Sequence, residues 1–161
     1  MGKMINGIWV DWIEKVKVLQ KAVVMRSDGK ILALKRPNDN HTRPACWDLP
    51  GGSIDAKDIK LWKEKSGRGD KNDILVKAIK REIFEEAGLK VLKTKAVHAA
   101  SGLNEKKGVF IVGIGYFCTV KDDEIRLSPE HAKYKWVAKQ EFVSFDVGDD
   151  GGFINAILNH I

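Results

Sequence analysis

Cysteine is scarce in this sequence, which contains only Cys46 and Cys118, far apart along the chain. Neither has a second Cys or a His at the spacing of a metal-binding motif, which argues against a zinc module. Two thiols are also too few for a disulfide framework. We therefore expect both cysteines to be reduced thiols.

Long apolar runs are also missing. The best one, "VFIVGIGYFCTV" at 109–120, is far short of the roughly 20 residues that a membrane-spanning helix needs. Residues 1–18 carry charges throughout and contain no apolar segment of the kind found in signal peptides. We therefore expect a cytoplasmic protein that does not associate with membranes.

The chain has no internal repeat and no low-complexity linker, and its 161 residues suit one domain with its own core. Its 43% hydrophobic and 31% charged content argues against disorder. Lys and Arg number 28 against 22 Asp and Glu, and the resulting charge of +6 suits an anionic partner. We predict one domain over residues 1–161, with residues 1–15 as an N-terminal extension.

Several short segments have the composition of strands. Residues 16–26 and 30–36 flank the turn signal "SDG", which predicts a β-hairpin. Residues 91–101, 108–120 and 134–138 are further strand candidates. Because 108–120 is almost entirely apolar, we expect it to be central, with both faces covered.

Two segments have helical periodicity. Over 73–87, apolar residues recur on one side, Asn72 or Asp73 can cap the start, and Gly88 can end the helix. A final helix is predicted within 151–161. Strands followed by covering helices indicate an α/β or α+β layered domain.

The predicted helix at 73–87 carries a cluster of acids. Glu82, Glu85 and Glu86 stand at i, i+3 and i+4, so their carboxylates share one face. Such hard oxygen ligands suit Mg²⁺ or Mn²⁺. The alternative is a solvated face with intrahelical pairs such as Arg81 with Glu85. The Gly-Gly turn of "WDLPGG" (47–52) favours the metal site, because glycine lets backbone approach a ligand closely.

Together these motifs resemble the Nudix hydrolases. The Nudix box is G-x5-E-x7-R-E-U-x-E-E-x-G-U, with U aliphatic, and "REIFEEAGL" (81–89) matches its second half at every fixed position. "WDLPGG" is similar to the usual lead-in, and "SPEHAKYKWVAKQEF" (128–142) is similar to a segment near the end of many members. The resemblance implies an α/β fold, a Nudix-type α/β/α sandwich with a mixed β-sheet. The box helix would lie on one side and the C-terminal helix on the other.

The first half of the box departs from the family pattern, because about 15 extra residues separate Gly52 from Arg81. We place the insertion at 56–72 and expect a surface excursion, with a substrate lid as the alternative. Counting forward from Gly52 puts Asp58 in the place of the first box glutamate, whereas counting back from Arg81 puts Asp73 there. We prefer Asp73, which would lie at the helix start near Arg81.

The resemblance implies roles for the matched residues. Glu82, Glu85 and Glu86 would bind Mg²⁺, or Mn²⁺ as a substitute, and the carbonyl of Gly51 would complete the ligand set. Arg81 would orient a carboxylate through a bidentate ion pair.

The implied reaction is hydrolysis of a nucleoside diphosphate linked to another moiety, as in a nucleotide sugar, ADP-ribose or a nucleoside triphosphate. A metal-activated water would attack the diphosphate. The first candidate for the general base is Glu82, and the second is Glu130.

Substrate contacts are expected from the turn and its surroundings. Arg36 and Arg43 could contact phosphates, Trp47 could stack on a base, and Gly52 would let backbone approach the ligand. The alternatives are surface arginines and a core tryptophan. The expected partner is a nucleotide-type small molecule, and the resemblance also allows a homodimer.

Two other functions stay open at this point. One is pyrophosphohydrolysis at the 5′ end of RNA, which the positive charge permits. The other is a catalytically silent, Nudix-like nucleotide sensor. The sequence identifies neither the nucleobase nor the leaving moiety.

Overall fold

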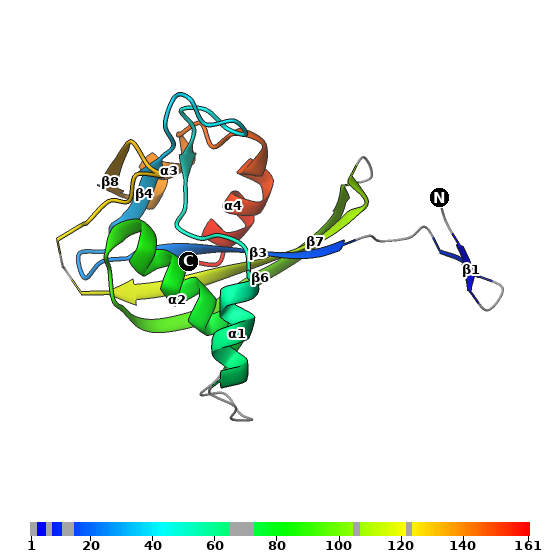
Figure 1. Ribbon diagram of the computed structural model, residues 1–161. Coiled ribbons are helices and arrows are strands. Elements are labelled where there is room, and N and C mark those ends of the chain that lie inside the picture. The colour runs from blue at the N-terminus through cyan, green and yellow to red at the C-terminus, as the bar shows by residue number, and fades with distance from the viewer. Residues whose placement is uncertain (1–2, 6–7, 11–14, 65–72, 105–106, 122–123) are drawn as a thin grey trace.

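A six-stranded mixed sheet organises the chain, with two long parallel strands at its centre (Figure 1). The computed structural model describes residues 3–5, 8–10, 15–64, 73–104, 107–121 and 124–161. The strands of this sheet are β3 (Lys15–Met25), β4 (Ile31–Lys35), β5 (Trp47–Asp48), β6 (Val91–Asn104), β7 (Val109–Val120) and β8 (Lys133–Val137). Their order is β5-β4-β3-β7-β6, and β8 pairs with β4.

The predicted hairpin is confirmed, since β3 and β4 are antiparallel with Met25 opposite Ile31. Strand β3, however, pairs in parallel with β7 over its whole length, from Lys15 opposite Val109 to Met25 opposite Thr119. This long-range partner was not predicted. Strand β6 continues to Asn104, past its predicted end, because β7 provides a partner as far as Val109.

Helices cover both faces of the sheet. They are α1 (Ala56–Glu64), α2 (Ile74–Ala87), α3 (Lys139–Val143), the 3₁₀ helix η3 (Gly148–Asp150) and α4 (Gly151–Leu158). Side chains alternate along β3, so Ala22 and Val24 pack with α2, whereas Val23 packs with α4. The predicted sandwich, with α2 and α4 on opposite sides, is confirmed (Figure 1).

The predicted central position of β7 is also confirmed. It lies between β3 and β6, and its Tyr116 and Cys118 belong to the core on the α2 side. On the α4 side, Gly115 leaves room for Ile157, whose side chain would collide with a Cβ at this position. Both faces of the strand are therefore packed against helices.

The sequence around α2 explains its ends. The Asp73 carboxylate accepts hydrogen bonds from the amides of Leu75 (2.8 Å) and Val76 (3.4 Å), which are unpaired within the first turn. The helix ends at Ala87 because Gly88, with φ of 74°, adopts the left-handed conformation that closes many helices. The helix predicted over 73–87 is confirmed, with Asp73 as its cap.

Two segments relate to the predicted extension and insertion. Strands β1 (Lys3–Ile5) and β2 (Ile8–Val10) form a two-stranded antiparallel hairpin within the extension at 1–15. In the predicted insertion at 56–72, α1 occupies the first part, and residues 65–72 lie outside the described part of the chain. Among the described residues, no helix has the length and apolar character needed to cross a membrane.

Candidate active site

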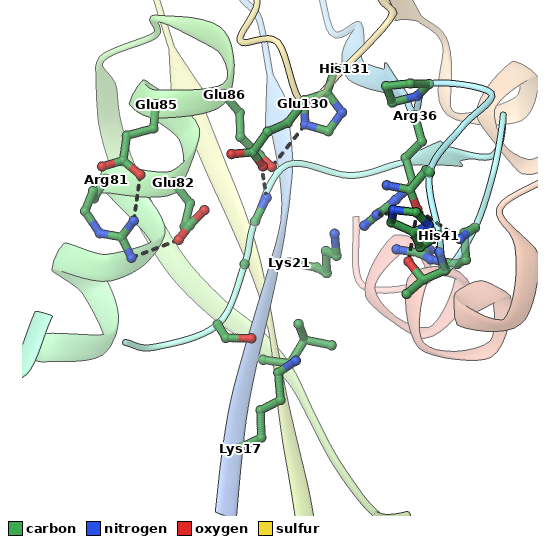
Figure 2. A pocket seen from close by; sticks show the side chains of 18 of the residues that line it. Lys17, Lys21, Arg36, His41, Arg81, Glu82, Glu85, Glu86, Glu130 and His131 are labelled. Carbon is green, nitrogen blue, oxygen red and sulfur yellow. Dashed lines mark hydrogen bonds and ion pairs between the residues drawn. The ribbon is translucent and has the colours of Figure 1, made fainter. Parts of the chain in front are cut away.

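A cavity of about 670 Å³ lies between the acidic edge of α2 and the wall formed by β3 and the loop after β4. Figure 2 shows Glu82, Glu85 and Glu86 on one side of it and Arg36 on the other, with Lys21 between. The cavity thus has an acidic side and a basic side.

Arg81 organises two of the acids on α2. Its Nη2 lies 2.8 Å from Glu82 Oε1, and its Nη1 lies 2.7 Å from Glu85 Oε2 (Figure 2). The intrahelical pair between Arg81 and Glu85 is therefore present, and both residues line the cavity, with the Glu85 side chain 47% exposed.

The Gly-Gly turn passes so close to α2 and β3 that side chains do not fit. A Cβ on Gly52 would lie 2.6 Å from Glu82 Oε2, and a Cβ on Gly51 would collide with the backbone carbonyl of Gln20. Gly51 also has φ of 141°, which side chains rarely permit. Glycine at both positions therefore brings the backbone directly against the Glu82 carboxylate.

Glu86 connects this turn to the loop before β8. Its Oε2 accepts the Gly51 amide hydrogen at 2.9 Å, and its Oε1 lies 3.1 Å from His131 Nε2. The carbonyls of Pro50 and Gly52 accept hydrogen bonds from β3, whereas the Gly51 carbonyl has no donor among the described residues. This carbonyl oxygen is therefore available to a ligand.

The aspartate that contacts Arg81 is Asp58, near the start of α1. Its carboxylate makes two bonds to Arg81, Nε to Oδ1 at 2.8 Å and Nη2 to Oδ2 at 2.9 Å. Burial opposes ionisation, but Arg81 and the Asp55 amide outweigh it and lower the pKa of Asp58. The expectation that Asp73 lies beside Arg81 is wrong, because its carboxylate caps α2.

The residues on the acidic side fit a divalent cation. Burial raises the pKa of Glu82, and the nearby Glu86 carboxylate raises it further, against the opposing effect of Arg81. A cation would relieve this unfavourable ionisation, and carboxylates with a free carbonyl are the oxygen ligands that Mg²⁺ accepts. In this structure Arg81 pairs with Glu82, and His131 pairs with Glu86. In the described ranges, no three His, Cys, Asp or Glu side chains are grouped closely enough to hold one metal ion.

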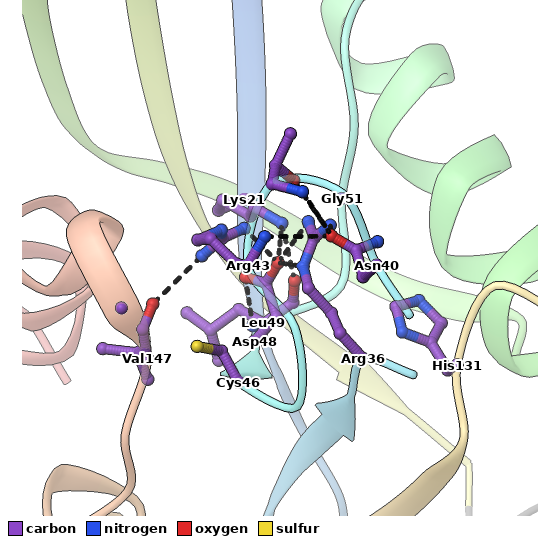
Figure 3. A network of polar contacts seen from close by, with 12 residues as sticks. Lys21, Arg36, Asn40, Arg43, Cys46, Asp48, Leu49, Gly51, His131 and Val147 are labelled. Carbon is purple, nitrogen blue, oxygen red and sulfur yellow. Dashed lines mark hydrogen bonds and ion pairs between the residues drawn. The ribbon is translucent and has the colours of Figure 1, made fainter. Parts of the chain in front are cut away.

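The basic side is built around one buried carboxylate, Asp48 (Figure 3). Its Oδ2 lies 2.8 Å from Lys21 Nζ, 2.8 Å from Arg36 Nη2 and 2.6 Å from Arg43 Nη2, while Oδ1 accepts the Leu49 amide hydrogen. Burial raises the pKa of Asp48, but the three cations outweigh it and hold the pKa below its ordinary value of 3.8. Arg36 and Arg43 line the cavity.

Lys21 and Asp48 were not predicted as parts of the site. A signal was available, because "QK" at 20–21 interrupts the apolar strand sequence "VLQKAVVM", and polar side chains in a buried strand need partners. The neighbouring Gln20 is also fully buried and donates hydrogen bonds to Leu75 O and Tyr116 Oη.

Trp47 does not face the cavity. It is 9% exposed and belongs to the core on the α4 side, where its ring stacks on Phe145 with centroids 4.7 Å apart. The expectation that Trp47 stacks on a base is therefore corrected. Glu130 is exposed and does line the cavity.

The fold and the site together define a class of protein, a hydrolase whose acidic helix and Gly-Gly turn meet beside a cavity lined with cations. The family model of the NUDIX domain matches residues 20–155, so the chain belongs to the Nudix hydrolases. It is a Nudix-type pyrophosphohydrolase, and such enzymes generally use a divalent metal ion.

Individual proteins that are similar in sequence or in structure support the same family assignment. The chain is 23% identical to "Nucleoside triphosphatase NudI" of Escherichia coli over 135 residues, which cover 77% of this chain and 84% of NudI. The MutT protein of Methanosarcina mazei Go1 has a TM-score of 0.65 at 20% identity, covering 94% of this chain and 95% of its own. The NUDIX domain of Shewanella oneidensis NrtR, solved with ADP ribose, has a TM-score of 0.62 at 17% identity, covering 86% and 84%. The structural matches show a shared fold.

Proposed function

We propose that the protein hydrolyses a nucleoside diphosphate that is linked to another moiety, with Mg²⁺ as its cofactor. The bond that it cleaves lies within the diphosphate. The observation that carries this proposal is the contact between the Gly-Gly turn and the α2 acids, with Glu82 against Gly52 and Glu86 bonded to Gly51. The names of the relatives, a nucleoside triphosphatase and a domain solved with ADP ribose, support a nucleotide substrate.

The proposed metal ligands are the carboxylates of Glu82, Glu85 and Glu86 and the carbonyl of Gly51. When bound, a divalent ion neutralises the diphosphate and activates the water nucleophile, and Mn²⁺ can replace Mg²⁺ in such oxygen sites.

Asp58 is proposed as the acid that takes the place of the first box glutamate. Its two bonds to Arg81 hold the guanidinium, which in turn holds Glu82 and Glu85. Arg81 is therefore a positioning residue in this proposal. With Asp58 in this position, the extra residues that separate the two halves of the box come after Asp58 in the sequence.

Glu82 is the first candidate for the base that accepts the proton of the attacking water. Its carboxylate lines the cavity directly against Gly52, which supports this role because it places an oxygen acceptor beside the proposed metal ligands. The oxygen of water bonds to one phosphorus as the anhydride P–O bond breaks, and the second phosphate leaves with its bridging oxygen. Glu130, exposed at the edge of the cavity, is the second candidate.

The test is hydrolysis of a nucleotide panel with Mg²⁺ and with Mn²⁺. It includes nucleoside triphosphates, nucleotide sugars, ADP-ribose, dinucleoside polyphosphates and 5′-triphosphorylated RNA. At least one of the small-molecule nucleotides is cleaved by the wild type, and Glu85→Gln loses most of this activity. Glu141→Gln is the matched control, because Glu141 is exposed and lies outside the cavity lining.

Two results would contradict the proposal. Tight nucleotide binding by a folded wild type without any turnover would instead support the sensor function. Cleavage of RNA alone, with affinity that falls steeply as salt is added, would support RNA 5′-end processing.

A further inference from the structure

Strand β6 forms one edge of the six-stranded sheet. It has 14 residues, Val91–Asn104, and among the described strands it pairs with β7 alone. Every residue from 99 to 104 is exposed, and the hairpin that β6 forms with β7 extends beyond the helices (Figure 1). The backbone groups on the outer side of β6 therefore have no strand partner in the described part of the chain.

The exposed half of this edge lacks the features that usually prevent sheet edges from pairing. Edge strands are normally short, bulged, or supplied with charges or proline, because a free edge binds other strands. Residues 96–104, "AVHAASGLN", contain no Lys, Arg, Asp, Glu or Pro. The bulge between Ala96 and His98 comes before the exposed half, as do Lys93 and Lys95. In a chain with a charge of +6, this uncharged stretch is where a second copy meets least repulsion.

A strand edge can pair with its own copy in antiparallel fashion across a twofold axis, so that each residue of one copy has the same partner in the other. The stretch between the bulge and the end of β6 is 98–104, and its central residue is Ser101. Pairing about this centre places Ser101 opposite itself and Ala99 opposite Leu103 of the partner subunit. No like charges are opposite each other over these seven positions, because the stretch contains no Lys, Arg, Asp or Glu.

The position of Leu103 fits this register. Its side chain is 50% exposed, and it shares a sheet face with Ala99, because alternate residues of a strand point to the same side. Ala99 lines a hollow of about 460 Å³ beside α2, together with Leu75, Val76 and Ile114. In the register about Ser101, each exposed leucine packs on Ala99 of the other copy at the edge of this apolar hollow.

We propose that two copies of this chain pair through residues 98–104 of β6, antiparallel and centred on Ser101, and so join their sheets into one. Backbone hydrogen bonds provide the affinity, and the contact between Leu103 and Ala99 fixes the register. None of the residues that line the candidate active-site cavity belongs to β6, so the paired stretch lies outside it. The inference concerns assembly and does not depend on the proposed function.

The first test measures the mass of the protein in solution by sedimentation equilibrium over a range of concentrations. The wild type sediments as two chains. Ser101→Lys weakens the dimer about tenfold, because two like charges then lie directly opposite each other. Leu92→Lys is the matched control and keeps the dimer, since Leu92 is also exposed on β6, at 54%, and lies outside the paired stretch. An equal mixture of Ser101→Lys and Ser101→Glu restores the dimer, which excludes misfolding as the cause of the loss.

The second test measures the register by cysteine cross-linking. Only a residue at the twofold axis lies opposite itself, so Ser101→Cys forms a disulfide-linked dimer under mild oxidation. Gly102→Cys is the matched control, because its Cβ meets nothing within 4 Å but lies too far from its own copy for a disulfide. The native Cys46 and Cys118 are buried and do not interfere.

Three results would overturn the pairing. The wild type could remain a single chain at every concentration, as expected if another segment of the same chain covered this edge. The dimer could persist unweakened in Ser101→Lys, which would place the interface on another surface. Ser101→Cys and Gly102→Cys could cross-link equally, which would contradict a register centred on Ser101.

Discussion

At the scale of single residues, Gly52 limits how close the backbone comes to the Glu82 carboxylate. Replacing it with alanine places a methyl group 2.6 Å from Oε2, so the carboxylate must move. We expect Gly52→Ala to lower kcat/KM about tenfold to a hundredfold, because small displacements of catalytic groups are costly. Gly102→Ala is the control, since its Cβ would meet nothing within 4 Å. Full activity of Gly52→Ala would show that the close approach is not required.

Asp48 is the residue on which the cationic wall depends. Asp48→Asn removes the carboxylate that Lys21, Arg36 and Arg43 share, and we expect the free energy of unfolding at neutral pH to fall by about 3 to 5 kcal/mol. Denaturant unfolding followed by circular dichroism measures this change. A loss below 1 kcal/mol would contradict the assigned structural role.

We also expect the stability difference between the wild type and Asp48→Asn to depend on pH. The pKa of Asp48 is lowered in the folded state from 3.8, so ionisation of this group stabilises the fold fully above that pH. As the pH falls toward the folded-state pKa, this stabilisation is lost from the wild type. The difference in unfolding free energy between wild type and Asp48→Asn therefore narrows below pH 3.8. A difference that stays constant down to this range would argue against a lowered pKa.

At the scale of elements, the aspartates near the starts of α1 and α2 have different roles: Asp58 binds Arg81, and Asp73 caps α2. Asp58→Asn removes the charge that holds Arg81, and we expect activity to fall about tenfold to a hundredfold, as for other residues that position ligands. Asp73→Ala removes a helix cap and costs about 1 kcal/mol of stability with activity retained. Steady-state kinetics and thermal unfolding of both variants separate these effects. The reverse pattern would assign the box acid to Asp73.

At the scale of the whole molecule, a metal that binds only the folded state must stabilise it. We expect Mg²⁺ or Mn²⁺ at saturating concentration to raise the Tm by several degrees, since about 2.7 kcal/mol is gained at a hundredfold excess over Kd. Glu86→Gln abolishes most of this shift, whereas Glu141→Gln retains it. An equal shift in both variants would place the metal elsewhere.

Local patterns predicted much of the fold. The apolar stripe of α2, its cap at Asp73 and its end at Gly88 all follow from neighbouring residues, because helix formation depends on contacts within a few positions. The covered strand β7 was predictable from its apolar composition. Its parallel pairing with β3 was not, since strand partners far apart in the sequence leave no local signal.

Sequence patterns named the acids of the candidate site and two of its cations, Arg36 and Arg43, but they missed Lys21 and Asp48. The spacing of Glu82, Glu85 and Glu86 places them on one helix edge in any structure where that helix forms. The cluster around Asp48 instead joins Lys21 on β3, Arg36 and Arg43 near the next loop, and a carboxylate on β5. No spacing rule connects residues from three separate segments.

The sequence by itself therefore determined the family, the box helix and the acids on its edge, because these depend on a short pattern with helical periodicity. The tertiary structure decided which aspartate contacts Arg81, where Trp47 lies and how the cations gather opposite α2. The physical reason is that ion pairs and burial depend on distances in space, and chain folding sets those distances between residues that are remote in sequence.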